Sequence, residues 1–152
     1  GNADKNGVYL DENIRRIMTV FRRQFGRLSL ALAAEGDNER AIAAAEKGLA
    51  IVPPEKMPYD YYSLDLAEGL LKAGKKDEAV KIYNDIIDNS VENLEFISSL
   101  PAGKLFGLDF HSGVSLQALY DIYKVAGAEG ITDLADKAAA LLNKYYGEKP
   151  QK

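Results

Sequence analysis

Apolar residues recur at steps of three and four along most of the chain, which is the spacing of one face of a helix. The first such stretch runs from about residue 12 to Ala34. Asp11 is a plausible N-cap, and Gly36 can adopt the left-handed conformation that often ends a helix. The residues expected to face the core are Ile14, Ile17, Met18, Phe21, Phe25, Leu28 and Leu32. No segment shows the sustained alternation of a strand, so we predict an all-α protein.

Six further helices are expected, separated by glycine, asparagine or proline. Pro53 and Pro54 end the second helix, because proline lacks the backbone donor and clashes with the preceding turn. Residues 101–111 contain two glycines and are expected to form a loop. The predicted helices cover about 38–51, 62–73, 77–89, 94–100, 112–126 and 132–146.

The first helical segments repeat. Gly36 and Gly74 are 38 residues apart, and the alanine and aliphatic positions that follow them match at the same offsets. The pattern resembles the tetratricopeptide repeat, a pair of antiparallel helices of about 34 residues with a turn glycine and a small alanine early in the second helix. A third, degenerate unit surrounds Gly130. We therefore expect one helical-repeat domain over 1–152, a short right-handed superhelix of about seven helices. Its units are about 12–53, 58–91 and 112–146, with an inserted helix at about 92–100.

Positive charge is concentrated at the N-terminal end. Residues 1–34 hold six basic and three acidic groups, a net of +3, whereas the remaining 118 residues hold 13 basic and 20 acidic groups, a net of −7. The sequence pI of about 5.1 argues against general nucleic-acid binding, since most of the surface would repel phosphate.

Five of the six arginines fall in the first predicted helix: Arg15, Arg16, Arg22, Arg23 and Arg27. At about 100° per residue, Arg16, Arg23 and Arg27 cluster within about 40° of one another, and the apolar face lies opposite. Arg15 and Arg22 form a second cluster within about 20°. Two interpretations stay open. The arginines contact an anionic partner, such as lipid head groups, the membrane portion of a parent chain, or a carboxylate or phosphate ligand. Alternatively, they form a solvated helix face.

Other candidate chemistry is sparse. Tyr59 and Tyr61 belong to a YDYY string whose tyrosines suit a protein or peptide interface, although Pro58 and Asp60 also suit a purely structural helix start. His111 is the only histidine, and there is no cysteine, so we expect no metal site and no cofactor. We also expect no catalytic residue in this chain.

Three stretches carry a narrower resemblance: NIRRIMTVFRRQFGRLSLALAAEGD (13–37), VPPEKMPYDYYSLDLAEGLLKAGK (52–75) and the helices downstream of them. The matching residues are Asn13, Arg15, Arg16, Phe25, Arg27, Leu28, Pro58, Tyr59, Asp60 and Tyr61. They are similar to the C-terminal soluble domain of bacterial multi-pass membrane proteins that resemble glycosyltransferases of the protein O-mannosyltransferase type. Met57 departs from the valine expected before Pro58. The match covers the chain to about Gly74 and fades after Pro101. The resemblance implies an extracytoplasmic, periplasmic appendage, with any transferase chemistry in the membrane portion.

These observations favour a non-catalytic interaction or scaffold domain attached to a membrane glycosyltransferase-like protein. The alternative is a free-standing tetratricopeptide adaptor that binds peptides on its concave face and is located in the cytoplasm. A small enzyme is the third hypothesis, and the lack of cysteine and of a histidine pair counts against it.

Overall fold

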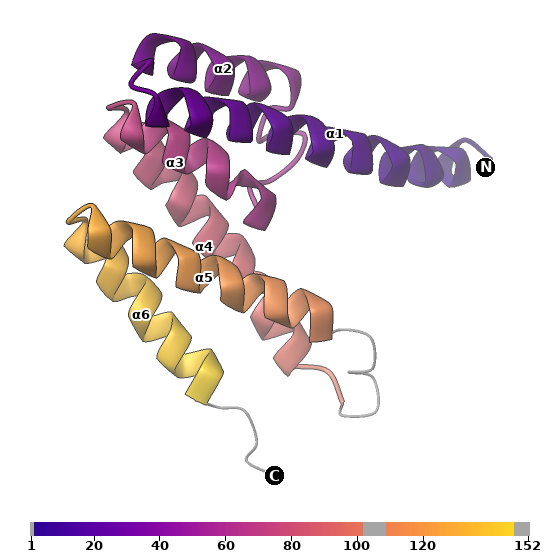
Figure 1. The fold of residues 1–152 in the computed structure, drawn as a ribbon. Helices are drawn as coiled ribbons and strands as arrows, with labels where there is room; N and C mark the ends of the chain where they lie inside the picture. Colours follow the sequence, from indigo (N-terminus) through magenta and orange to yellow (C-terminus); the bar gives the residue numbers. More distant parts are fainter. Residues whose placement is uncertain (1, 102–108, 148–152) are drawn as a thin grey trace. The chain divides into compact units, whose positions relative to one another are not determined.

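The fold is all-helical over the residues that the structure, a computed structural model, describes: the backbone of 2–101 and 109–147, and the side chains of 12–101 and 111–146. This part contains no strand, which confirms the predicted fold class. It forms six α-helices and one short 3-10 helix (Figure 1), namely α1 (Asn2–Ala34), α2 (Asn38–Ile51), η1 (Tyr61–Ser63), α3 (Leu64–Lys72), α4 (Lys76–Ser98), α5 (Asp109–Ala128) and α6 (Thr132–Gly147).

Several predicted helix boundaries were wrong. The expected break near Asn89 is absent, and α4 runs through both predicted helices, because no glycine or proline interrupts residues 76–98. The helix α1 begins at Asn2, so Asp11 lies inside it and is not an N-cap. The helix α5 begins at Asp109, before the predicted start. Most of the predicted loop, residues 102–108, lies outside the described residues.

The chain divides into two compact units. Unit 1 comprises Gly1–Pro58 and Asp65–Glu78 and therefore holds α1, α2 and nearly all of α3. Unit 2 comprises Tyr59–Leu64 and Ala79–Lys152 and holds η1, most of α4, α5 and α6.

Three glycines end helices in the same way. Gly36, Gly74 and Gly130 have φ angles of 84°, 99° and 73°, a region that a Cβ makes costly for other residues. In each case the residue after the glycine donates its N–H to the carbonyl oxygen of the residue five positions earlier in the chain. These bonds join Asp37 to Leu32 at 2.9 Å, Lys75 to Leu70 at 2.8 Å and Ile131 to Ala126 at 2.8 Å. The turn roles predicted for these glycines are confirmed.

Small residues bring the helices of unit 1 close together. The helix α2 runs antiparallel beside the C-terminal part of α1 (Figure 1), and the Ser29 Oγ donates a hydrogen bond to the Ala41 carbonyl at 2.8 Å. On α3, a Cβ added to Gly69 would lie 2.4 Å from the Ser29 Oγ. On α1, a Cβ added to Gly26 would lie 2.8 Å from the Leu66 backbone nitrogen. Since real Cβ atoms do not approach so closely, only glycine fits at either position.

In unit 2, α5 and α6 pack as an antiparallel pair (Figure 1). A polar contact joins α4 to α6, where Glu95 accepts hydrogen bonds from the Tyr145 hydroxyl and the Lys144 ammonium. The Tyr145 hydrogen bond is the main cause that lowers the pKa of Glu95 below its ordinary value of 4.5, and the Lys144 charge adds to it. Because the pKa of Glu95 is lower in the folded chain, this contact stabilises the fold at pH values above the ordinary pKa of the carboxyl group. The stabilisation is lost as the pH falls through the lowered pKa.

Candidate functional site

Arg22 lies in the core of unit 1, although the sequence placed it on an exposed basic arc. Its side chain is fully buried. One terminal nitrogen donates to the Pro58 carbonyl at 3.0 Å, and the other donates to the carbonyls of Val52 at 2.9 Å and Met57 at 2.6 Å. A buried guanidinium is costly unless it is hydrogen-bonded, and the linker supplies the acceptors. Arg22 therefore holds the 52–58 linker against α1 and is not available to a partner.

The position of Arg22 fixes which face of α1 is packed. Among residues 12–34 of this helix, the buried ones are Arg22, Gly26, Ser29 and Leu32. Phe25 is half-buried and lies against Gly48 of α2. The predicted inward face was therefore wrong for most of its members, and right for Leu32 and in part for Phe25 and Met18. The sequence feature that marks the packed face is a set of three small or polar residues at helical spacing, Arg22, Gly26 and Ser29. A prediction based on apolar residues alone overlooks them.

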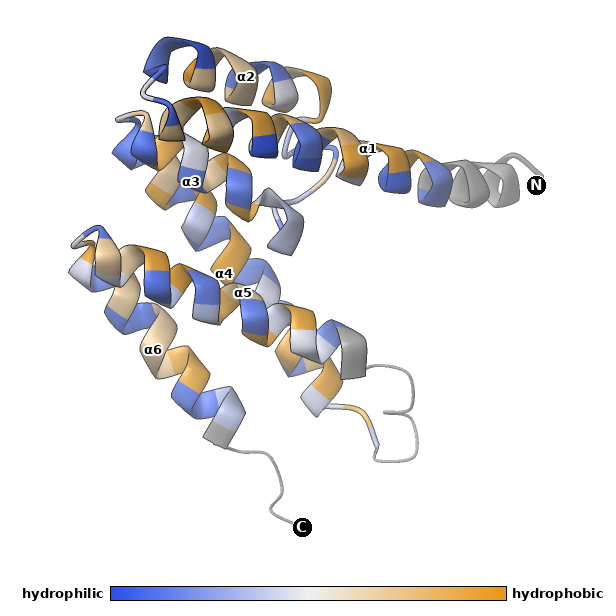
Figure 2. Ribbon diagram, viewed as in Figure 1, coloured by the Kyte–Doolittle hydropathy of each residue, from blue (hydrophilic) through white to orange (hydrophobic). Residues whose placement is uncertain are grey.

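The large apolar side chains of α1 are exposed instead. The exposed fractions are 43% for Ile14, 55% for Ile17, 53% for Val20, 47% for Phe21 and 48% for Leu28. Figure 2 shows hydrophobic and hydrophilic residues alternating along the part of α1 that runs past the end of α2. We call these five residues the apolar arc. An exposed apolar stripe of this kind marks an interaction site more often than scattered surface leucines do.

The other arginines of α1 remain at the surface. Arg15, Arg16, Arg23 and Arg27 are all exposed. At about 100° per residue, Arg16, Arg23 and Arg27 lie along one edge of the apolar arc, with Val20 about 20° from Arg27. We call these three residues the arginine edge. The exposed side of α1 is thus itself amphipathic, with a basic edge and an apolar centre.

The two candidate tyrosines are placed differently. Tyr59 is only 7% exposed, so it is not available as a surface contact, and its carbonyl accepts a hydrogen bond from the Asn89 side chain at 3.1 Å. Tyr61 opens η1, whose N-cap is Asp60, with the Asp60 carboxylate accepting from the Tyr62 backbone N–H at 3.0 Å. The prediction that Asp60 begins a helix is therefore confirmed.

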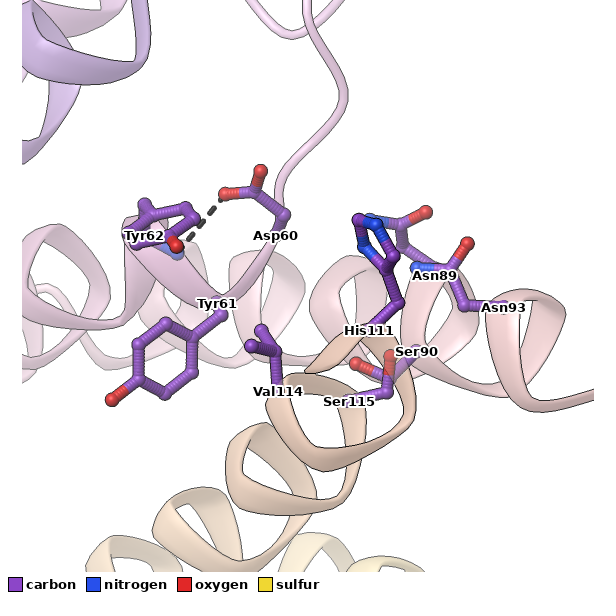
Figure 3. Close-up of a pocket in the computed structure, with 9 residues that line it drawn as sticks. All are labelled: Asp60, Tyr61, Tyr62, Asn89, Ser90, Asn93, His111, Val114 and Ser115. Carbon is purple, nitrogen blue, oxygen red and sulfur yellow. Dashed lines mark hydrogen bonds between the residues drawn. The ribbon is translucent and has the colours of Figure 1, made fainter. Parts of the chain in front are cut away.

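Tyr61 lines a pocket of about 270 Å³ within unit 2 (Figure 3). Three segments form it: the start of η1, the middle of α4 and the first two turns of α5. Its lining combines aromatic rings, amide and hydroxyl groups, one aliphatic side chain and one carboxylate, namely Asp60, Tyr61, Tyr62, Asn89, Ser90, Asn93, His111, Val114 and Ser115. In Figure 3 the Tyr61 ring lies beside Val114, and the His111 ring rises from the first turn of α5. The sequence gave no signal for this pocket, because its segments are far apart along the chain.

Neither metal binding nor membrane crossing finds support in the described residues. Within them, no three histidine, aspartate or glutamate side chains are grouped so as to hold a metal ion. No helix in the same part of the chain has the length and the apolar character that a membrane span requires.

We predict that Arg22→Met lowers the free energy of unfolding by about 2–4 kcal/mol, because buried carbonyls lose charge-assisted hydrogen bonds worth about 1.5–3 kcal/mol each while methionine restores part of the apolar packing. Urea unfolding followed by circular dichroism measures the change. Arg27→Met is the matched control on the same helix, and its effect should stay within about 0.5 kcal/mol since Arg27 is exposed. Equal losses in the two variants would contradict the buried role of Arg22.

Comparison of the chain with protein-family models, with curated proteins and with solved structures finds no match.

Proposed function

We propose that this chain is a non-catalytic interaction domain, tethered outside the cytoplasm to a membrane protein of the glycosyltransferase type, and that α1 is its contact surface. The observation that carries the interaction role is the exposed side of α1. A helix that buries an arginine and a serine while it leaves isoleucine and phenylalanine in solvent is not arranged for its own stability alone. An interaction partner that covers the apolar arc accounts for this arrangement.

The attachment to a membrane protein rests on the sequence resemblance over residues 13–28 and 58–61. The tetratricopeptide-like arrangement rests on the matching turns at Gly36, Gly74 and Gly130, all with positive φ.

The test is site-specific labelling in the full-length protein in its native membrane. This chain has no cysteine, so one cysteine introduced into it reports one position once the cysteines elsewhere in the full-length protein are replaced by serine. We expect Ile17→Cys to react slowly with a membrane-impermeant maleimide, because a partner covers the apolar arc. Phe96→Cys on α4 is the control, since Phe96 is 61% exposed and lies far from α1 in sequence. It should react quickly when the reagent is added outside the cytoplasm.

Two results would contradict the proposal. If Ile17→Cys reacts as fast as Phe96→Cys, then α1 is not covered by a partner. If the gene begins near Gly1 and encodes no apolar spans upstream, then the domain is not a membrane appendage.

The pocket favours a second candidate function, a peptide-binding adaptor. Asn93 carries both a donor and two acceptor lone pairs on its amide, which suits the N–H and C=O groups of an extended peptide. The Tyr61 ring beside Val114 provides the apolar surface for one side chain. Two lining residues, Ser90 and Ser115, are each only 4% exposed, so the pocket reaches buried polar side chains.

If the chain is a peptide-binding adaptor, a random-sequence peptide array should identify peptides with dissociation constants in the micromolar range. These correspond to a binding free energy of about −8 kcal/mol. Asn93→Ala combined with Tyr61→Ala should weaken that binding at least tenfold in a fluorescence polarisation assay. Tyr120→Ala is the matched control, because Tyr120 is exposed on α5 and does not line the pocket. An array without binders, or binding that survives the pocket variants, rules the adaptor function out.

A further inference from the structure

The geometry of α1 points to a partner: we infer that the apolar arc and the arginine edge dock on the surface of an anionic lipid bilayer, with α1 lying in the plane of the interface. This inference rests on the proposed interaction role of α1 and names its partner. It differs from a membrane span, because no helix in the described part of the chain is apolar enough to cross a bilayer.

The apolar arc has the shape that interfacial insertion requires. From Ile14 to Leu28 it extends about 21 Å along one straight helix, at about 1.5 Å per residue. At about 100° per residue, Ile17, Val20, Phe21 and Leu28 lie within about 100° of one another, and residues 12–34 place no charged side chain in that sector. A convex, uncharged ridge of this kind can enter the boundary between head groups and acyl chains.

The arginine edge supplies the complementary charge. Arg16, Arg23 and Arg27 repeat at steps of seven and four, so they follow the ridge along its length. Glu12 lies on the same edge, which leaves it a net charge of +2. Long arginine side chains beside an apolar surface can extend their guanidinium groups to phosphate oxygens while the helix axis sits deeper. The rest of the chain is acidic, with a net of −7 over residues 35–152, so an anionic surface attracts this edge and repels the remainder. Docking is therefore oriented.

A second copy of the chain fits this face less well. In an antiparallel pair of copies, the two arginine edges would lie on the same side of the interface, and like charges repel. An acidic protein groove would match the charge, and the experiment below separates it from lipid.

The first experiment places a fluorescent reporter in the arc. The chain has no tryptophan, so Phe21→Trp gives a single reporter. With vesicles of equal parts phosphatidylglycerol and phosphatidylcholine, we expect a blue-shifted emission that brominated acyl chains quench. Vesicles of phosphatidylcholine alone should give no shift. Phe96→Trp is the matched control, since it is equally a surface phenylalanine but lies on α4, and its emission should not change with either vesicle.

The second experiment measures affinity by co-sedimentation with the same vesicles. Each arginine near an anionic surface contributes about a fivefold increase in affinity, so Arg16→Gln with Arg27→Gln should weaken binding about 25-fold. Lys47→Gln with Lys75→Gln removes the same charge from exposed positions of unit 1 outside α1, and binding should change less than about threefold, the long-range effect of net charge. Ile17→Ser with Phe21→Ser should abolish binding while the melting temperature stays unchanged, because both side chains are already exposed.

The outcomes separate the partner from the interaction role. Binding that requires both the arginine edge and the apolar arc supports the inference. If the wild-type chain does not bind vesicles that contain phosphatidylglycerol, or if the arginine variants bind as well as wild type, the inference that lipid is the partner is wrong. If vesicle binding is absent but Ile17→Cys is still protected in the native membrane, a protein covers α1, and only the proposed interaction function survives. If neither is seen, both proposals fail.

Discussion

The hydrogen bonds from Arg22 to the linker carbonyls are the constraint on which unit 1 depends. The linker contains three prolines, Pro53, Pro54 and Pro58, so it cannot continue α2. Its own turn satisfies the Pro53 carbonyl, which accepts from the Lys56 and Met57 N–H groups at 3.1 Å. The buried guanidinium reaches the carbonyls of Val52, Met57 and Pro58. A single side chain thus satisfies a segment of irregular backbone and joins it to α1.

That constraint determines the rotation of α1. With Arg22 inside, residues 26, 29 and 32 follow it into the core at helical spacing, and glycine and serine allow the neighbouring helices to approach. The same rotation turns Ile17, Phe21 and Leu28 outward. The apolar arc is therefore a direct consequence of burying Arg22, and its adjacency to the arginine edge follows from the same helical geometry. The rotation of α1 that buries Arg22 therefore determines both the core of unit 1 and the proposed contact surface.

The sequence predicted the local structure well and the packing of α1 poorly. Turn glycines could be recognised because left-handed backbone has few alternatives to glycine, and the aliphatic period of α3 and α4 identified buried residues such as Leu66, Leu70 and Ile86. The period of α1 was ambiguous, since its apolar residues are as regular as those of a core-facing helix. The spacing of apolar residues alone cannot show that Arg22, a charged residue, lies in the core in place of those apolar side chains. The pocket in unit 2 depends on contacts between distant segments, so periodicity could not predict it.

The rotation of α1 can be measured directly by hydroxyl-radical footprinting of Phe21 and Phe25. The two side chains have the same intrinsic reactivity, lie one turn apart on the same helix, and flank Arg22 closely. Because Phe21 is 47% exposed and Phe25 lies against α2, the structure predicts that Phe21 is oxidised several times faster in the folded chain and that the difference disappears in denaturant. Faster oxidation of Phe25, or equal rates in the folded chain, would contradict the inward position of Arg22 and with it the exposed apolar arc.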